Sequence, residues 1–231
     1  MANFECRALG KRYGHVQALE NVDITVESGR VVGLLGPNGS GKTTLIKLAN
    51  GLLTPDAGSI SICGKTPGPE TRAMVSYLPD RPMLPQWMRA RELIKFYADF
   101  YADFDTQRAL DMLGRLGVPA DRRIRQMSKG TQEKVQLILV MSRRAKLYLL
   151  DEPIGGVDPA TRDFILDTIL RNFDGGSSIV ISTHLISDVE KALDDVVFIN
   201  NGHVMLQSSV DDIRERNGMS VDALFREVFK C

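Results

Sequence analysis

The fold of this chain is decided by the stretch Gly36-Pro37-Asn38-Gly39-Ser40-Gly41-Lys42-Thr43-Thr44. An apolar run at 31–35 precedes it and an apolar-rich segment at 45–49 follows, so the order is strand, glycine-rich loop and helix. The glycines let several N–H groups converge on one anion, and the helix adds the positive end of its dipole. Lys42 can reach the β- and γ-phosphates of a nucleotide, and the Thr43 hydroxyl can bind Mg²⁺. The stretch predicts a nucleotide site, and the alternative is a glycine-rich turn with a chance lysine.

The composition is that of a globular protein without a bias towards nucleic acid. In 231 residues, 43% are hydrophobic and 25% are charged, with 29 basic and 29 acidic side chains. A zero net charge gives no field that favours nucleic acid, so no nucleic-acid partner is expected. Cys6, Cys63 and Cys231 show no metal or redox spacing, which favours reduced thiols in a cytosolic protein. No signal segment is recognised, and no stretch approaches the roughly 20 apolar residues of a membrane span.

The periodicity along the chain predicts a nucleotide-binding core with a helical insertion. The strand Phe4–Leu9 and a turn over 10–14 come first, and alternation over 22–26 predicts a strand with one wet face. Continuous apolar runs at 147–150 and 178–182 predict buried strands. From Ala90 to about Gly117 the period becomes helical, with a second helix expected to begin at Asp105 as its N-cap. We therefore expect one domain over 1–231, with a core at 1–86 and 145–231 and an insertion at 87–144.

A pair of acids follows the buried run at 147–150. Asp151, at the strand end, can hold Mg²⁺ or its waters, and Glu152 can accept a proton from an attacking water. Two surface acids that merely end a strand are the alternative, and the pair alone does not decide between them.

Five segments in the right order give the chain a resemblance to the ABC-type ATPases. They are the Walker B-like Leu147-Tyr148-Leu149-Leu150-Asp151-Glu152-Pro153, the signature-like Met127-Ser128-Lys129-Gly130-Thr131, the D-loop-like Gly155-Gly156-Val157-Asp158, the H-loop-like Thr183-His184, and Tyr13 as the A-loop aromatic. The agreement runs from Tyr13 to His184. Within the family, the length and the Ser-Lys-Gly signature resemble the ATP-binding subunits of bacterial ABC-2-type exporters, including those for antimicrobial peptides and drugs.

The resemblance implies a fold class and a set of site residues. The fold would be α/β, a P-loop NTPase core with a mostly parallel sheet, an N-terminal antiparallel β-subdomain and an inserted α-helical subdomain. The catalytic residues would be Glu152, His184 and Lys42, acting on ATP with Mg²⁺. The nucleotide would contact Tyr13, Gly36, Pro37, Asn38, Gly39, Ser40, Gly41, Lys42, Thr43, Thr44, Ser128, Gly130 and Asp158. The metal would be held by Thr43, Asp151 and Asp80.

Partners are also implied by the resemblance. Ser128, at a helix start, would close over the nucleotide of a second ATPase subunit, giving a head-to-tail homodimer or heterodimer with two sandwiched ATPs. A separate transmembrane permease would hold the chain at the inner face of the cell membrane, as a peripheral cytoplasmic subunit. The sequence departs from the family pattern at Lys129 and Thr131 of the signature, at Gly156 of the D-loop, and at Asp80, which stands in the position of the Q-loop glutamine.

The segment Pro79–Met88 is the expected surface for the permease, because it gathers Met83, Leu84, Trp87 and Met88 in a loop. The alternative is that these side chains seal the insertion against the core. Two other functions were weighed. A soluble ABC-type ATPase outside transport would be expected to have a second cassette, long coiled-coil insertions or zinc-binding cysteines. A GTPase switch would need an [NT]-K-x-D motif, which is not found.

Overall fold

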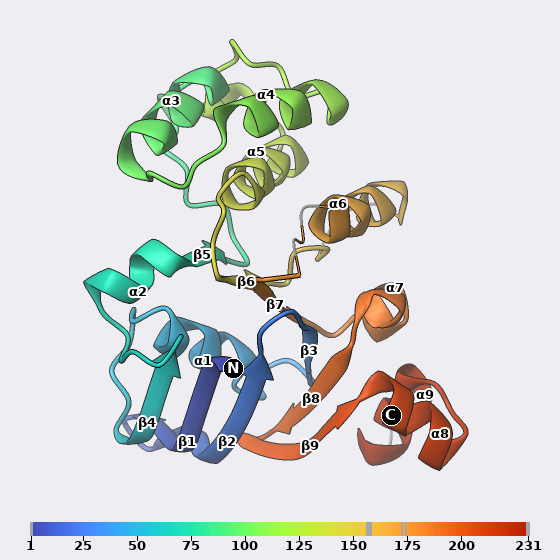
Figure 1. Cartoon of the computed structure of the whole chain (residues 1–231). Helices are drawn as coiled ribbons and strands as arrows, with labels where there is room; N and C mark the ends of the chain where they lie inside the picture. The colour runs from blue at the N-terminus through green and yellow to red at the C-terminus, as the bar shows by residue number, and fades with distance from the viewer. Residues whose placement is uncertain (1, 156–158, 172, 174, 230–231) are drawn as a thin grey trace.

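The computed structural model describes residues 2–155, 159–171, 173 and 175–229 (Figure 1). Its strands are β1 (Ala2–Tyr13), β2 (Val16–Glu27), β3 (Val31–Leu35), β4 (Ala57–Ile62), β5 (Val75–Leu78), β6 (Leu147–Asp151), β7 (Ser178–Thr183), β8 (Asp195–Asn200) and β9 (His203–Ser209). Its helices are α1 (Lys42–Ala49), α2 (Pro69–Met74), α3 (Ala90–Phe100), α4 (Thr106–Arg115), α5 (Lys129–Met141), α6 (Pro159–Arg171), α7 (Ile186–Val189), α8 (Val210–Asn217) and α9 (Val221–Phe229), with short 3₁₀ turns η1 (Ile124–Gln126) and η2 (Glu190–Ala192).

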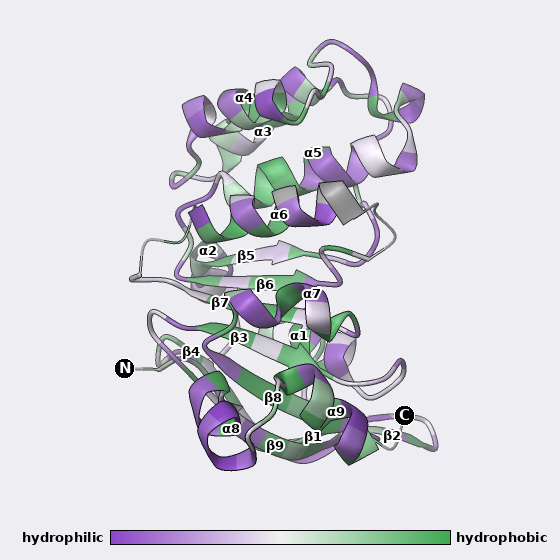
Figure 2. Cartoon of the chain, turned by 90° about the vertical axis from the view of Figure 1, so that its right-hand side faces the viewer, coloured by the Kyte–Doolittle hydropathy of each residue, from purple (hydrophilic) through white to green (hydrophobic). Residues whose placement is uncertain are grey.

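The main sheet has six strands in the order β5-β6-β7-β3-β8-β9. The first five run parallel, and β9 pairs antiparallel with β8. Strands β3, β6 and β7 are buried along their whole length, as a parallel sheet covered on both faces requires. They cross the middle of the molecule (Figure 2). Because parallel strands end at one edge, the segments after Leu78, Asp151, Thr183 and Leu35 all leave the sheet on the same side.

A second sheet, β2-β1-β4, is antiparallel throughout. In β2 the apolar side chains at 22, 24 and 26 are buried, and the polar ones between them are exposed, which confirms the predicted alternation. The turn predicted over 10–14 was wrong. Strand β1 continues to Tyr13, paired with Val16, and reverses at Gly14 with φ 59°. Pairing with β2 extends the strand through glycine and charged residues whose local preference is for a turn.

Helices α3, α4 and α5 lie between β5 and β6 in the chain and form one end of the molecule (Figure 1). Asp105 is the N-cap of α4, as predicted, and its carboxylate accepts a hydrogen bond of 3.0 Å from the Arg108 amide. The apolar side chains of α5 pack into the same hydrophobic core as β6 and β7. The helices therefore form a body that joins the sheet mainly through α5.

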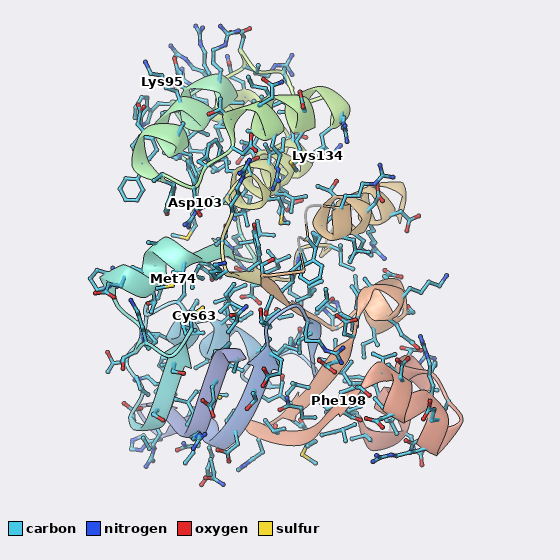
Figure 3. The ribbon with its side chains drawn as sticks, viewed as in Figure 1. Cys63, Met74, Lys95, Asp103, Lys134 and Phe198 are labelled. Atoms are coloured by element: carbon cyan, nitrogen blue, oxygen red, sulfur yellow. The ribbon has the colours of Figure 1, made fainter. Side chains whose placement is uncertain are left out.

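A buried arginine anchors the end of α5 to the core. Arg143 is 3% exposed, and its guanidinium donates hydrogen bonds of 2.6 Å to the carbonyls of Ala73 and Val75. It also pairs with the Asp103 carboxylate at 3.1 Å and lies 3.8 Å from the Tyr101 ring centre. Asp103 lies on the side of the helices that faces α2 (Figure 3). A fully partnered buried guanidinium fixes this junction, because removing any partner would leave a buried charge unsatisfied.

The opposite end of the molecule is closed by the C-terminal helices. Phe198 of β8 packs edge-on against Phe225 of α9, with ring centres 5.4 Å apart (Figure 3). The hairpin between β8 and β9 turns at Asn201 and Gly202, both with positive φ. Among the residues that the structure describes, none of the helices is long and apolar enough to cross a membrane.

Candidate active site

The phosphate loop runs from the end of β3 to the start of α1. Gly39 and Gly41 adopt φ values of 82° and 109°, a region that side chains rarely enter. Gly36 is required for space, because a Cβ there would lie 2.2 Å from the carbonyl oxygen of Ile199. The loop can therefore form only with glycine at these places, and the sequence at 36–44 provides them.

Lys42 occupies the first position of α1 and is 6% exposed. Its ammonium donates to the carbonyl oxygens of Gly36 at 2.7 Å and Pro37 at 3.0 Å, which holds the charge over the loop. Burial lowers the pKa of Lys42, and the negative charges of Glu152 and Asp151 oppose that shift. The ammonium thus lies in the field of both carboxylates, in a place where a phosphate would take over its hydrogen bonds.

Asp151, the last residue of β6, is 1% exposed. Its Oδ1 accepts a hydrogen bond of 2.5 Å from the Ser182 hydroxyl, on the neighbouring strand β7, where the two residues are paired in register. Burial raises the pKa of Asp151; hydrogen bonds from Ser182 and Thr43 counteract this, and the charges of Asp80 and Glu152 raise it further. Oδ2 is buried, and none of the described residues donates a hydrogen bond to it. A buried carboxylate oxygen without a partner is costly in a protein and suited to a cation.

Glu152 follows with φ 51°, a left-handed conformation rare for a side chain of this size. Its amide donates to the Ser182 carbonyl at 3.0 Å, which ties its backbone to β7. Both carboxylate oxygens lie 3.1 Å from Nδ1 of His184, the residue after β7. The Glu152 side chain is 19% exposed, so its carboxylate is reachable from solvent while the imidazole holds it.

Of two more predicted residues, Asp80 lies at this edge of the sheet, and Tyr13 lies at the end of β1 in the second sheet. Asp80 follows β5 and lines a pocket together with Glu133, Glu152 and Pro153. Its side chain is 53% exposed, and its charge raises the pKa of Asp151, so it lies within electrostatic range of the predicted metal ligands. Tyr13 ends β1 with an exposed ring, and the Lys11 ammonium lies 6.0 Å from the ring centre.

The signature residues lie apart from the phosphate loop. Ser128 is the exposed N-cap of α5, and its hydroxyl accepts from the Thr131 amide at 3.2 Å. A Cβ at Gly130 would meet nothing within 4 Å, so the first turn of the helix has an open surface. In Figures 1 and 2, α5 lies across β5 and β6 from α1. Asp158 lies outside the described residues.

Sequence reasoning missed Ser182, which holds Asp151 through its hydroxyl and Glu152 through its carbonyl. The available signal was a polar residue at the end of an otherwise apolar strand, two positions before His184. Its role depends on strand register, which the sequence does not state.

A glycine-rich phosphate loop beside an Asp-Glu pair, at the carboxyl edge of a parallel sheet, defines a P-loop nucleotide hydrolase. The family model described as "ABC transporter" matches residues 19–155, more than half of the chain. The chain belongs to the ABC transporter family, as an ATP-binding subunit that energises a transporter by hydrolysing ATP.

Curated relatives resemble the chain over most of its length. The ABC-type transporter ATP-binding protein EcsA of Bacillus subtilis (strain 168) is 31% identical, with 94% of this chain and 93% of the relative covered. The SkfA peptide export ATP-binding protein SkfE of the same organism is 32% identical, with the same coverage. The daunorubicin resistance ATP-binding protein DrrA3 of Streptomyces coeruleorubidus is 29% identical over 94% of this chain and 72% of its own length.

Solved structures share the fold. An ATP-binding subunit of an ABC transporter superposes with a TM-score of 0.88 at 32% identity, covering 98% of this chain and 99% of its own. The dimeric post-hydrolysis state of the ATP-binding cassette MJ0796, bound to ADP and Pi, gives a TM-score of 0.79 at 21% identity, over 89% of this chain and 98% of that one. The predicted fold class is confirmed: a mixed α/β cassette with a mostly parallel six-stranded sheet and a three-stranded antiparallel sheet.

Proposed function

We propose that this ATPase powers an exporter of drugs or antimicrobial peptides, and that ATP drives two such subunits into a head-to-tail dimer. One observation carries the proposal: the chain has two helix starts suited to phosphate, at Lys42 of α1 and at Ser128 of α5, and the two helices lie on different sides of β5 and β6. A chain cannot place both on one nucleotide by itself. Two chains in opposite orientation can place the Ser128 helix of each over the phosphate loop of the other.

In this proposal the phosphate loop binds the phosphates of ATP, and Lys42 moves its hydrogen bonds from the carbonyls of Gly36 and Pro37 to phosphate oxygens. The exchange needs little movement of the side chain, because the two carbonyls already hold the ammonium over the loop. Tyr13 supplies an exposed ring on which the adenine stacks.

The residues at the strand edge fit Mg²⁺. The buried Oδ2 of Asp151 has no hydrogen-bond donor among the described residues, the Thr43 hydroxyl is close enough to lower the pKa of that carboxyl, and Mg²⁺ prefers oxygen ligands of this kind. Asp151 and Thr43 would hold the ion, and Asp80 would add negative charge beside it. When bound, the ion neutralises charge that develops on the phosphate oxygens.

Glu152 then acts as the general base that accepts a proton from the attacking water. Its carboxylate contacts Nδ1 of His184 at 3.1 Å, and its backbone amide donates a hydrogen bond to the Ser182 carbonyl. His184 orients the carboxylate and, with its exposed face, is available to the γ-phosphate. Ser128 and Gly130 of the second chain complete the site.

A membrane permease is the proposed partner, reached through the segment Pro79–Met88. In it Met83 and Trp87 are 80% and 69% exposed, whereas Leu84 and Met88 are buried. One pair of apolar side chains is therefore buried, as sealing of the insertion requires, and the outward-facing pair supports the proposal of a partner surface. The relatives SkfE and DrrA3, by their names, serve peptide export and daunorubicin resistance, which supports an exporter here.

The dependence of hydrolysis on protein concentration tests the two-chain site. If each site needs two chains, the ATPase rate per milligram rises in proportion to protein concentration well below the dimer dissociation constant and then levels off. A rate per milligram that stays constant down to nanomolar protein would show that one chain hydrolyses ATP alone.

A further inference from the structure

A buried glutamine joins the segment that carries Asp80 to the helix that begins at Ser128. Gln136 lies in the middle of α5 and is 5% exposed. Its amide nitrogen donates to the carbonyl of Pro79 at 3.3 Å, and its amide oxygen accepts from the amide of Met83 at 2.9 Å. The amide nitrogen and the amide oxygen of Gln136 thus bind backbone groups on either side of Asp80 in the sequence.

The rest of the same segment is bound to the helical insertion by backbone contacts. The amides of Arg125 and Ile124 donate to the carbonyls of Gln86 and Met88, at 3.0 Å and 2.9 Å. Gln136 therefore fixes the first half of the segment Pro79–Met88, and η1 fixes the second half. The first half directly continues β5, which pairs with β6, the strand that delivers Asp151.

We propose that Gln136 is a positioning residue that holds the segment at 79–83 against α5 and so sets the position of Asp80 relative to Asp151 and Glu152. The physical reason is the burial of the amide: a buried carboxamide holds its two partners firmly because an unmade hydrogen bond there is costly. That Asp80 lies beside the metal during hydrolysis rests on the proposed function. The contact itself, and its effect on hydrolysis, do not.

The substitution Gln136→Met tests the inference, since methionine has nearly the same length and cannot make either hydrogen bond. Ser76→Ala is the matched control: the Ser76 hydroxyl donates to the Val140 carbonyl at 2.8 Å, so the control removes another buried hydrogen bond between β5 and the same helix without freeing the segment. If Gln136→Met does not fold, Gln136→Asn, which is too short to span both partners, takes its place.

Amide hydrogen exchange on the protein without nucleotide measures the contact. In Gln136→Met the Met83 amide should exchange on the order of tenfold faster, because it loses its acceptor. The amides of Ile124 and Arg125 should stay as they are, and Ser76→Ala should leave Met83 unchanged. Equal exchange of Met83 in Gln136→Met and the wild type would overturn the inference.

Steady-state hydrolysis measures the consequence. We expect kcat of Gln136→Met to fall on the order of tenfold while the KM for ATP stays within about twofold, since the phosphate loop is untouched. An unchanged kcat, or an equal loss of kcat in Ser76→Ala, would overturn the positioning role. Failure of the two-chain mechanism would show instead as a constant rate per milligram at all protein concentrations, with both Gln136 results intact.

Discussion

At the scale of single residues, Lys42 places a positive charge over the phosphate loop. It is held over the loop by two carbonyls and lies in the field of Asp151 and Glu152. We expect Lys42→Ala to reduce the ATPase rate by about a hundredfold or more, which corresponds to about 3 kcal/mol of transition-state stabilisation. Lys47→Ala, on the same helix, removes the same charge outside the loop and should keep the rate. Steady-state hydrolysis and fluorescent-nucleotide titration check this, and near wild-type turnover in Lys42→Ala would place the site elsewhere.

Asp151 should carry a stability cost that its function requires. Its pKa is raised, mainly by burial, so the folded state disfavours the ionised carboxyl at neutral pH. We expect Asp151→Asn to raise the stability of the protein without nucleotide by about 1 kcal/mol, or about 2–4 °C in Tm, while hydrolysis is lost. A carboxyl group whose pKa is raised in the folded state contributes stability at low pH. That contribution is lost as the pH rises through the folded-state pKa. The difference in Tm between Asp151→Asn and the wild type should therefore become smaller as the pH falls towards about 4. A lower Tm for Asp151→Asn at neutral pH would contradict the argument.

The residue types at 36–44 and 151–152 could be predicted because their chemistry needs those types at that spacing. The contacts of Ser182 and Gln136 could not, because each depends on a strand or helix packed beside it. Ser182 holds Asp151 only through the β6–β7 register, and Gln136 meets Pro79 from 57 positions away in the chain. A single sequence carries no statement of either pairing. The roles predicted for the site residues, including Tyr13, Asp80 and Asp158, stay predictions.

At the scale of elements, the segment Pro79–Met88 shows that the sequence of a loop does not predict which of its apolar side chains are buried. Trp87 and Met83 are exposed, and Leu84 and Met88 are buried, in a stretch whose sequence is apolar at all four places. We expect Trp87→Ala to leave the Tm and the ATPase rate of the isolated subunit unchanged but to weaken assembly with a membrane subunit by about tenfold or more.

Two controls separate docking from packing in that experiment. Met205→Ala removes a side chain that is 55% exposed on β9 and should leave assembly unchanged. Leu84→Ala removes a buried side chain and should lower stability by about 2–4 kcal/mol. If Trp87→Ala lowers the Tm as Leu84→Ala does, the tryptophan packs the insertion instead of contacting a partner. Co-purification of the two subunits in detergent, together with thermal melting, gives both readouts.

Strand limits were predicted less well than strand existence. Apolar runs in the sequence indicate buried parallel strands, and β3, β6 and β7 lie where the sequence predicts strands. Strand β1 runs four residues beyond its predicted end at Leu9, because its pairing with β2 holds Gly10 to Tyr13 extended. The boundaries at 87 and 144 of the helical insertion remain a prediction, and they fall close to α3 at one end and to the Arg143 anchor at the other.

At the scale of the whole molecule, the account depends on a second chain. The phosphate loop, Asp151, Glu152 and His184 meet at one edge of the sheet, and Ser128 begins a helix across β5 and β6. The fold could be predicted to this level because each segment has a family counterpart in the right order. The assembly could not be deduced from one chain, since nothing within it places Ser128 against a phosphate.

The most direct measurement is size-exclusion chromatography of two variants with ATP and Mg²⁺. Glu152→Gln removes the proposed general base, so ATP should bind and persist, and the protein should elute as a dimer with ATP and as a monomer without it. Adding Ser128→Arg, with bulk and charge at the exposed N-cap of α5, should return the protein to a monomer that still binds ATP. Adding Ser220→Arg instead, at the exposed serine whose hydroxyl accepts from the Ala223 amide at the start of α9, should leave the dimer intact. A dimer that survives Ser128→Arg, or one that never forms in Glu152→Gln, would contradict the two-chain nucleotide site.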